Sequence, residues 1–125
     1  MNRILIVAAL AASSSIAAAQ AVSVRLSEWK ISLSRDTVRA GSVNFRVSND
    51  GSMNHAFYVR GPGVAKGMRE IAQGESASLT VTLTPGTYDV YCPLSDGSHR
   101  QAGMAKTLVV LPAAASAPPH KKPNA

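Results

Sequence analysis

The chain has a single cysteine, Cys92, and this residue begins a segment that contains three different metal-binding side chains. His99 and Met104 follow it in the pattern C-x6-H-x4-M, and a second histidine, His55, lies well upstream. Two imidazoles, one thiolate and a weakly bound thioether are the ligand set of a mononuclear copper site that transfers electrons. A lone thiol cannot close a disulfide within the chain, so a structural bridge does not explain Cys92.

Each of these side chains also has an ordinary structural interpretation. A buried cysteine is most often an inert small apolar residue, and Met104 could equally be a packing residue of the core. His55 could be a hydrogen-bonded core histidine, and His99 could be a solvated loop residue. The presence of all four side chains together, with a predicted strand before Cys92, favours the metal site. Met53, two residues before His55, offers a second thioether near the same place.

The elements that must position these residues are predicted to be strands, because apolar and polar residues alternate with a period of two. The alternating apolar residues are Val43, Phe45 and Val47, then Leu79, Val81 and Leu83, then Tyr88 and Val90. Gly, Pro, Asn and Asp separate the runs, as expected for turns. The pattern predicts an all-β fold built as a two-layer sandwich or barrel. By strand parity, both Cys92 and His55 point to the apolar side.

Two segments depart from the simple pattern. In the first strand the apolar parity changes between Leu26 and Trp29, and we expect a β-bulge there that turns both sets inward. The two sets are Val22, Val24 and Leu26, then Trp29, Ile31 and Leu33. Residues 64–73 are the only candidate for a helix, and Gly67 favours a loop or a single turn there.

The two ends of the chain differ from its centre. Residues 1–21 contain a short basic start, an apolar stretch and A-x-A patterns that end at Ala19 and Ala21, which predicts a cleaved signal peptide and export to a periplasm. The apolar stretch is too short to span a bilayer, so no membrane span is expected. Residues 112–125 are rich in Pro, Ala and Lys and are predicted to be a disordered tail, in which His120 is solvated. One domain remains, over residues 22–111.

The formal net charge is +6, and the basic residues are dispersed along the chain. They form no run and are not interleaved with aromatic residues, so a nucleic-acid surface is not expected. A moderate positive field in an exported protein is better suited to an acidic protein partner, and the alternative is that the charge serves solubility alone. We expect a monomer.

At three places the sequence resembles the small blue-copper proteins, or cupredoxins, a group that includes plastocyanin, azurin and amicyanin. The resembling segments are Asn49-Asp50-Gly51 with His55-Ala56-Phe57, then Gly86-Thr87-Tyr88-Asp89-Val90-Tyr91-Cys92-Pro93, then His99 to Ala105. The resemblance implies a Greek-key β-sandwich over residues 22–111. It implies His55, Cys92, His99 and Met104 as ligands of one copper ion. It also implies one-electron exchange with redox protein partners, with His99 as the point of entry.

The sequence departs from that family around the ligands. Six residues separate Cys92 from His99, where plastocyanin-like loops have two. Ala56 and Pro93 occupy positions where many members have hydrogen-bonding side chains, so the support of the ligands must be built differently, with the Ala56 N–H still available to the sulfur.

Two further classes of function compete with the electron carrier. A periplasmic copper carrier or storage protein without a redox partner would use the same metal, and Met53 keeps this alternative open. A copper oxidase needs further copper centres with several more histidines, and the sequence has three histidines in all. We therefore expect no catalysis.

Overall fold

The computed structural model describes residues 20–113, in which nine strands and one short helix are found. The strands are β1 Gln20–Ser27, β2 Lys30–Leu33, β3 Thr37–Arg39, β4 Gly41–Asn49, β5 Tyr58–Gly61, β6 Val64–Gly67, β7 Ser76–Leu83, β8 Gly86–Tyr91 and β9 Ala105–Leu111. The helix α1 spans Ser98–Gln101. Most of the predicted signal peptide and tail, residues 1–19 and 114–125, lies outside the described residues.

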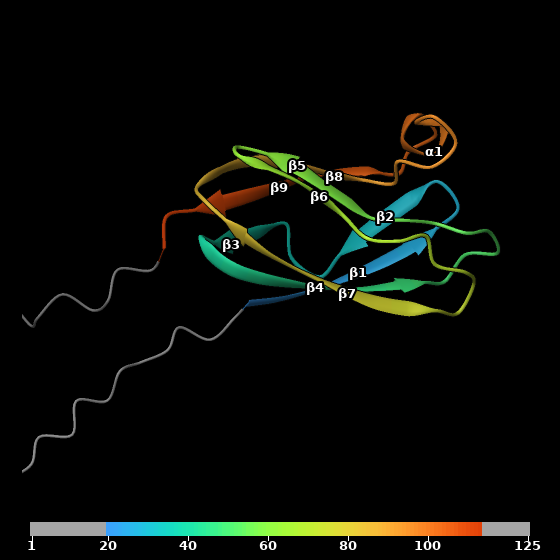
Figure 1. Ribbon diagram of the computed structural model, residues 1–125, viewed down its shortest axis with the longest axis horizontal. Coiled ribbons are helices and arrows are strands. Elements are labelled where there is room, and N and C mark those ends of the chain that lie inside the picture. The colour runs from blue at the N-terminus through green and yellow to red at the C-terminus, as the bar shows by residue number, and fades with distance from the viewer. Residues whose placement is uncertain (1–19, 114–125) are drawn as a thin grey trace, which may run out of the picture.

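The strands form two sheets that face each other (Figure 1). One sheet has the order β2-β1-β4-β7 and the other the order β3-β9-β8-β5-β6. Both sheets are mixed, because β1 pairs parallel with β4 and β3 pairs parallel with β9, while the other pairs are antiparallel. The predicted fold class, an all-β Greek-key sandwich of two sheets, is confirmed.

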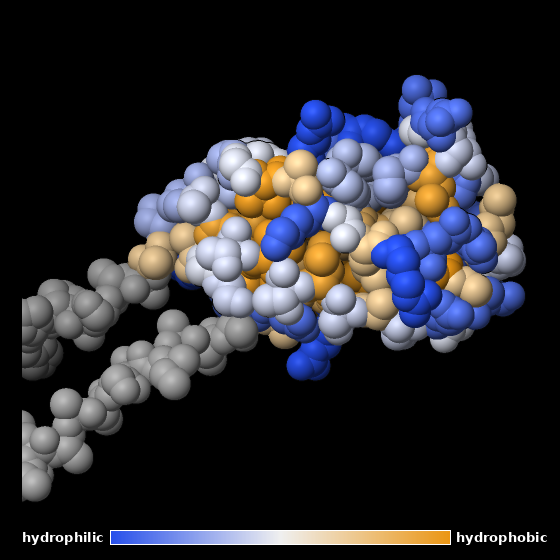
Figure 2. All heavy atoms as spheres, in the orientation of Figure 1, coloured by the Kyte–Doolittle hydropathy of each residue, from blue (hydrophilic) through white to orange (hydrophobic). Residues whose placement is uncertain are grey.

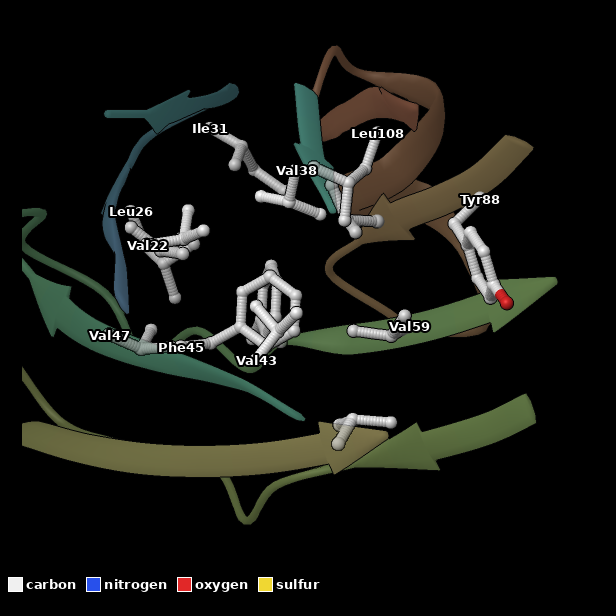
Figure 3. Packing of buried hydrophobic residues seen from close by; sticks show 14 of the residues in the cluster. Val22, Leu26, Ile31, Val38, Val43, Phe45, Val47, Val59, Tyr88 and Leu108 are labelled. Carbon is white, nitrogen blue, oxygen red and sulfur yellow. The ribbon is translucent and has the colours of Figure 1, made fainter. Parts of the chain in front are cut away.

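The period-two residues of the sequence form the core between the sheets (Figure 3). Val43, Phe45 and Val47 are buried along β4, and Tyr88 and Val90 are buried along β8. Each large apolar side chain removed from water in this way contributes about 1.5–3 kcal/mol. The resulting rigid sandwich is the scaffold from which the ligand loops extend.

The predicted bulge in the first strand is wrong, because the chain makes a two-residue hairpin turn there. Ser27 pairs with Lys30, so Glu28 and Trp29 form the turn between β1 and β2. Leu26 lies opposite Ile31 in the register, and residues opposite each other share a face, which explains the change of parity. Trp29 has φ = 61° and is 44% exposed instead of facing the core.

The predicted loop or single turn over residues 64–73 is wrong in part. Val64–Gly67 is strand β6, and Ile71 forms an isolated bridge with His55. Gly67 has a packing reason, since a Cβ there would lie 2.4 Å from the Tyr58 ring of β5. The helical turn of the described part is α1 instead, and no helix between residues 20 and 113 is long and apolar enough to cross a membrane.

The topology brings the candidate ligands to one end of the sandwich. Strands β8 and β9 are antiparallel neighbours, and Tyr91 pairs with Ala105, so residues 92–104 form the loop that joins them. His55 lies just before β5, which is the other neighbour of β8. The loop with α1 lies at the opposite end from residues 20 and 113 (Figure 1).

Candidate metal centre

Three of the four candidate ligands meet in the interior. The ligand atoms of His55, Cys92 and His99 all lie within 4.8 Å of one another. His55 and Cys92 are 0% exposed and His99 is 5% exposed. The fourth candidate, Met104, is also fully buried, and its main chain bonds to two of the others: its carbonyl accepts from the Cys92 N–H and its N–H donates to the His99 carbonyl, both at 3.1 Å.

The Cys92 sulfur is held at the end of β8, where the strand leaves the sheet. It accepts the Ala56 backbone N–H at 3.5 Å, the donor that the sequence left available. It lies 3.7 Å from Nδ1 of His99. The sulfur therefore faces both the segment of His55 and the loop of His99.

His99 is positioned by the single helical turn α1. Gly97 precedes the turn with φ = 85°, a conformation that glycine adopts without strain. The neighbouring Arg100 anchors the turn to β8, because its guanidinium pairs with Asp89 and lies 4.4 Å from the centroid of the Tyr91 ring. The six residues between Cys92 and His99 thus lead into an ordered helical turn, which places the His99 imidazole beside the Cys92 sulfur.

His55 is held by main-chain bonds on both sides. Its N–H donates to the Ile71 carbonyl at 3.1 Å, and its carbonyl accepts from the Ile71 N–H at 2.9 Å. The buried Asn49 amide fixes the surrounding loop, since Nδ2 donates to the carbonyls of Met53 and Ile71. Within residues 20–113, Nδ1 of the His55 ring is buried and has no hydrogen-bond partner.

Two residues that sequence reasoning missed support the imidazoles from the β1–β2 turn. Glu28 Oε1 accepts the N–H groups of Ser52 and Met53 at 2.7 and 2.9 Å and lies 3.3 Å from Nε2 of His55. The Met53 amide in particular, with Ser52 and His55, lowers the pKa of Glu28 from 4.5 to about 2, so the carboxylate is ionised at neutral pH. Trp29 makes an edge contact with the ring of His99, at 5.1 Å between centroids. In the sequence, the β1–β2 turn is indicated only by the change in parity of the apolar residues between Leu26 and Trp29.

The arrangement fits a copper ion. A buried polar atom without a partner is rare in folded proteins, and Nδ1 of His55 is such an atom beside a thiol and a second imidazole. Two imidazoles with one thiolate match the donor set of blue-copper sites. Held by separate segments of a rigid sheet scaffold, these donors suit a site whose geometry changes little between oxidation states.

Comparison with known proteins agrees with this description. A family model described as a cupredoxin-like domain matches residues 2–104. The fold is similar to dithionite-reduced auracyanin from the photosynthetic bacterium Roseiflexus castenholzii, with TM-score 0.63 and 18% identity over 77% of this chain and 100% of that chain. It is also similar to the blue copper oxidase from Nitrosomonas europaea, with TM-score 0.60 and 15% identity over 76% of this chain and 39% of that chain.

A multicopper oxidase named mgLAC is a further structural neighbour, with TM-score 0.54 and 19% identity over 74% of this chain and 38% of that chain. Identities at this level show the shared fold and no more. A sequence search of curated proteins gave no significant match. The family match covers most of the sequence, including His55, Cys92, His99 and Met104, and the chain therefore belongs to the cupredoxin-like family.

Proposed function

We propose that this protein is an exported blue-copper electron carrier in which His55, Cys92, His99 and Met104 hold one copper ion. The observation that supports this most is the meeting of His55, Cys92 and His99 in a buried cluster of a cupredoxin-like domain. Copper, when bound, supplies one-electron chemistry, because it is stable as both Cu(I) and Cu(II). The test is a redox titration of the copper-loaded protein, which should follow a one-electron curve reversibly without loss of metal.

The residues around the ligands keep their geometry fixed and exclude water. Burial of Cys92 and Met104 keeps solvent from the sulfur atoms. The Ala56 N–H bond to the sulfur and the Arg100–Asp89 pair hold the two ligand segments against the sheet. Little rearrangement is then needed when the charge at the site changes, and this favours fast electron exchange.

Electron exchange is proposed to occur at the end of the sandwich that contains α1. His99 is the least buried of the three clustered ligands, but at 5% exposure it is largely covered, and Trp29 stands against its ring with 44% exposure. A partner would therefore contact Trp29 together with the small residues of the loop. Those residues are Pro93, Leu94, Ala102 and Gly103, all exposed or half-buried.

The positive charge of the chain is expected to accelerate association with an acidic redox partner. Hydrophilic and apolar residues are interspersed over the face seen in Figure 2. Because the basic residues are dispersed along the sequence, we attribute the attraction to the net charge. Because the screening length shrinks from about 30 Å at 0.01 M salt to about 10 Å at 0.1 M, the association rate should fall as salt is added. Stopped-flow reduction by the anion hexacyanoferrate(II) measures this effect.

Neutral hydroquinone is the control for this salt dependence, and its rate should not change. Lys30→Gln, beside the exposed Trp29, should lower the rate with the anion more than Arg39→Gln, which removes a charge next to Gln20, at the start of β1. Equal salt dependence for the two reductants would contradict steering by charge.

Met104 is proposed to be the weak axial ligand, and its replacement should change the reduction potential without loss of copper. Met104→Leu removes a soft neutral donor and should raise the potential, whereas Met104→Gln supplies a harder oxygen that favours Cu(II) and should lower it. Cyclic voltammetry of the two variants gives the order. The reverse order, or complete loss of copper from Met104→Leu, would assign the axial position elsewhere, with Met53 as the next candidate.

A copper carrier or storage protein is the second candidate function. Met53 is 45% exposed, and its N–H bonds to the carboxylate that contacts His55, so a soft thioether lies at the rim near that histidine. A carrier should release copper to a chelator within minutes, whereas an electron carrier should retain it. The rate of metal release therefore separates the two functions.

An oxidase activity is not assigned to this chain, although oxidases are among its structural neighbours. The chain corresponds to only 39% and 38% of the two oxidases compared above. Of its three histidines, two lie in the cluster already described, and His120 is outside the described residues.

Export through the predicted N-terminal signal is part of the proposal. Strand β1 begins at Gln20, whose side chain bonds to the main chain of Arg39 in both directions, at 2.7 and 2.8 Å. Cleavage after Ala19 would keep this strand intact, whereas cleavage after Ala21 would remove its first two residues. N-terminal sequencing of the mature protein locates the cleavage site.

A further inference from the structure

The side chain of Glu28 reaches from the exposed β1–β2 turn to a buried candidate ligand. Its Oε1 atom lies 3.3 Å from Nε2 of His55, a ring that is 0% exposed, while the Glu28 side chain itself is 32% exposed. The same oxygen accepts the N–H groups of Ser52 and Met53 at 2.7 and 2.9 Å. Two backbone N–H groups and Nε2 of His55 thus converge on one carboxylate oxygen, which fixes its position against the imidazole.

Gly51 makes room for this carboxylate. A Cβ at that position would lie 2.5 Å from Glu28 Oε1 and 3.0 Å from its Cδ. Any larger residue at 51 would therefore push the carboxylate away from its present place. The loop that precedes His55 therefore leaves space for the Glu28 side chain at Gly51.

The hydrogen bond determines which nitrogen of His55 can bind a metal. Oε1 of Glu28 already accepts two backbone N–H groups and acts as an acceptor toward His55 too, so Nε2 of His55 is the protonated nitrogen. In a neutral imidazole the other nitrogen, Nδ1, then has a free lone pair. That nitrogen is the buried atom without a partner within residues 20–113, and its ring lies in the cluster with Cys92 and His99.

We infer that Glu28 is a positioning residue of the metal site: by accepting the Nε2 proton of His55 it selects the tautomer in which Nδ1 can bind copper. The inference rests on the proposed function for its metal and on the hydrogen bonds above for its mechanism. Carboxylates that orient a ligating histidine in this way also make the imidazole more basic. The fixed negative charge favours Cu(II) over Cu(I) and should hold the potential down.

The first test uses the metal-free protein and needs no redox activity. Two-bond ¹H–¹⁵N correlations of the His55 ring report its tautomer, and the wild type should show Nε2–H alone. Glu28→Gln presents both a donor and an acceptor, so a mixture of tautomers is expected. Gly51→Ala should produce the same mixture by displacing the carboxylate while its charge remains.

The matched control is Glu70→Gln, which makes the same chemical change at a carboxylate that bonds to Asn54 at 2.7 Å and not to a histidine. It should leave the His55 tautomer unchanged. If Glu28→Gln and Gly51→Ala also retain pure Nε2–H, Glu28 is an ordinary turn residue and the inference is overturned.

The second test measures copper itself. Glu28→Gln should raise the dissociation constant for Cu(II) about 10- to 100-fold, the usual effect of losing such a partner. It should also raise the reduction potential, while Glu70→Gln leaves both nearly unchanged. A potential that is unchanged or lower in Glu28→Gln would contradict the electrostatic part of the inference. A wild type that shows the expected tautomers but no blue-copper spectrum would instead overturn the proposed function alone.

Discussion

Replacing Cys92 by serine is expected to abolish the intense visible band of the copper-loaded protein completely. The band of a blue-copper site arises from charge transfer between a thiolate and the metal, and serine offers a hydroxyl in its place. Coordination removes the thiol proton outright, so the wild type should show the band at neutral pH. The substitution is nearly isosteric at a buried position, and the fold should be retained. Visible absorption after addition of Cu(II) to the purified protein measures the result.

Met53→Leu is the matched control for Cys92→Ser. It removes a sulfur atom near the site that is 45% exposed and is not proposed to bind copper in the electron carrier. The band should be unchanged in this variant. A band that survives in Cys92→Ser would show that the thiolate of Cys92 is not the ligand, whereas a band that disappears in Met53→Leu would show that Met53 is a ligand as well.

Replacing His55 by alanine should remove most of the thermal stabilisation that copper provides. At a free copper concentration of about 100 times the dissociation constant, binding to the folded state adds about 2.7 kcal/mol. For a domain of this size, this corresponds to a rise in Tm of about 10–20 °C. If the variant binds about 100-fold more weakly, the same copper concentration adds only about 0.4 kcal/mol. Differential scanning calorimetry with and without copper gives both shifts.

For each protein, the relevant quantity is the change in Tm on addition of copper. The Tm of the metal-free variant is itself expected to be lower, because a fully buried imidazole is lost. His120→Ala is the control, since it removes a histidine from the predicted tail. Its copper-induced shift should equal that of the wild type. A shift in His55→Ala as large as that of the wild type would exclude His55 as a ligand.

Much of the fold could be predicted because its strands are half-buried. In a strand with one face in the core, apolar and polar residues alternate along the sequence. Strands β4 and β8 show this alternation clearly. The same parity placed His55 and Cys92 inward, where the structure has them. The position of a site at the end of such strands can therefore be predicted from the pattern of the strands themselves.

The parts that could not be predicted depend on contacts between distant segments. A bulge and a two-residue hairpin both change strand parity, and only pairing with β2 distinguishes them. The helical turn α1 is too short to show a helical period, and it is held by Arg100 against β8. Glu28 has no local pattern that marks it, because its role arises from a hydrogen bond to a residue 27 positions away.

The spread of these contacts along the sequence has a consequence for the order of events as the chain folds. The Glu28–His55 contact joins residues 27 positions apart, and the Ala56–Cys92 contact joins residues 36 positions apart. Contacts of long sequence separation form late, because the intervening chain must first lose its freedom. An incompletely folded chain would hold the thiol of Cys92 and the imidazoles of His55 and His99 apart, with no pocket to combine them. We therefore expect tight copper binding only after both sheets have formed. Folded molecules should retain copper, and incompletely folded chains should not.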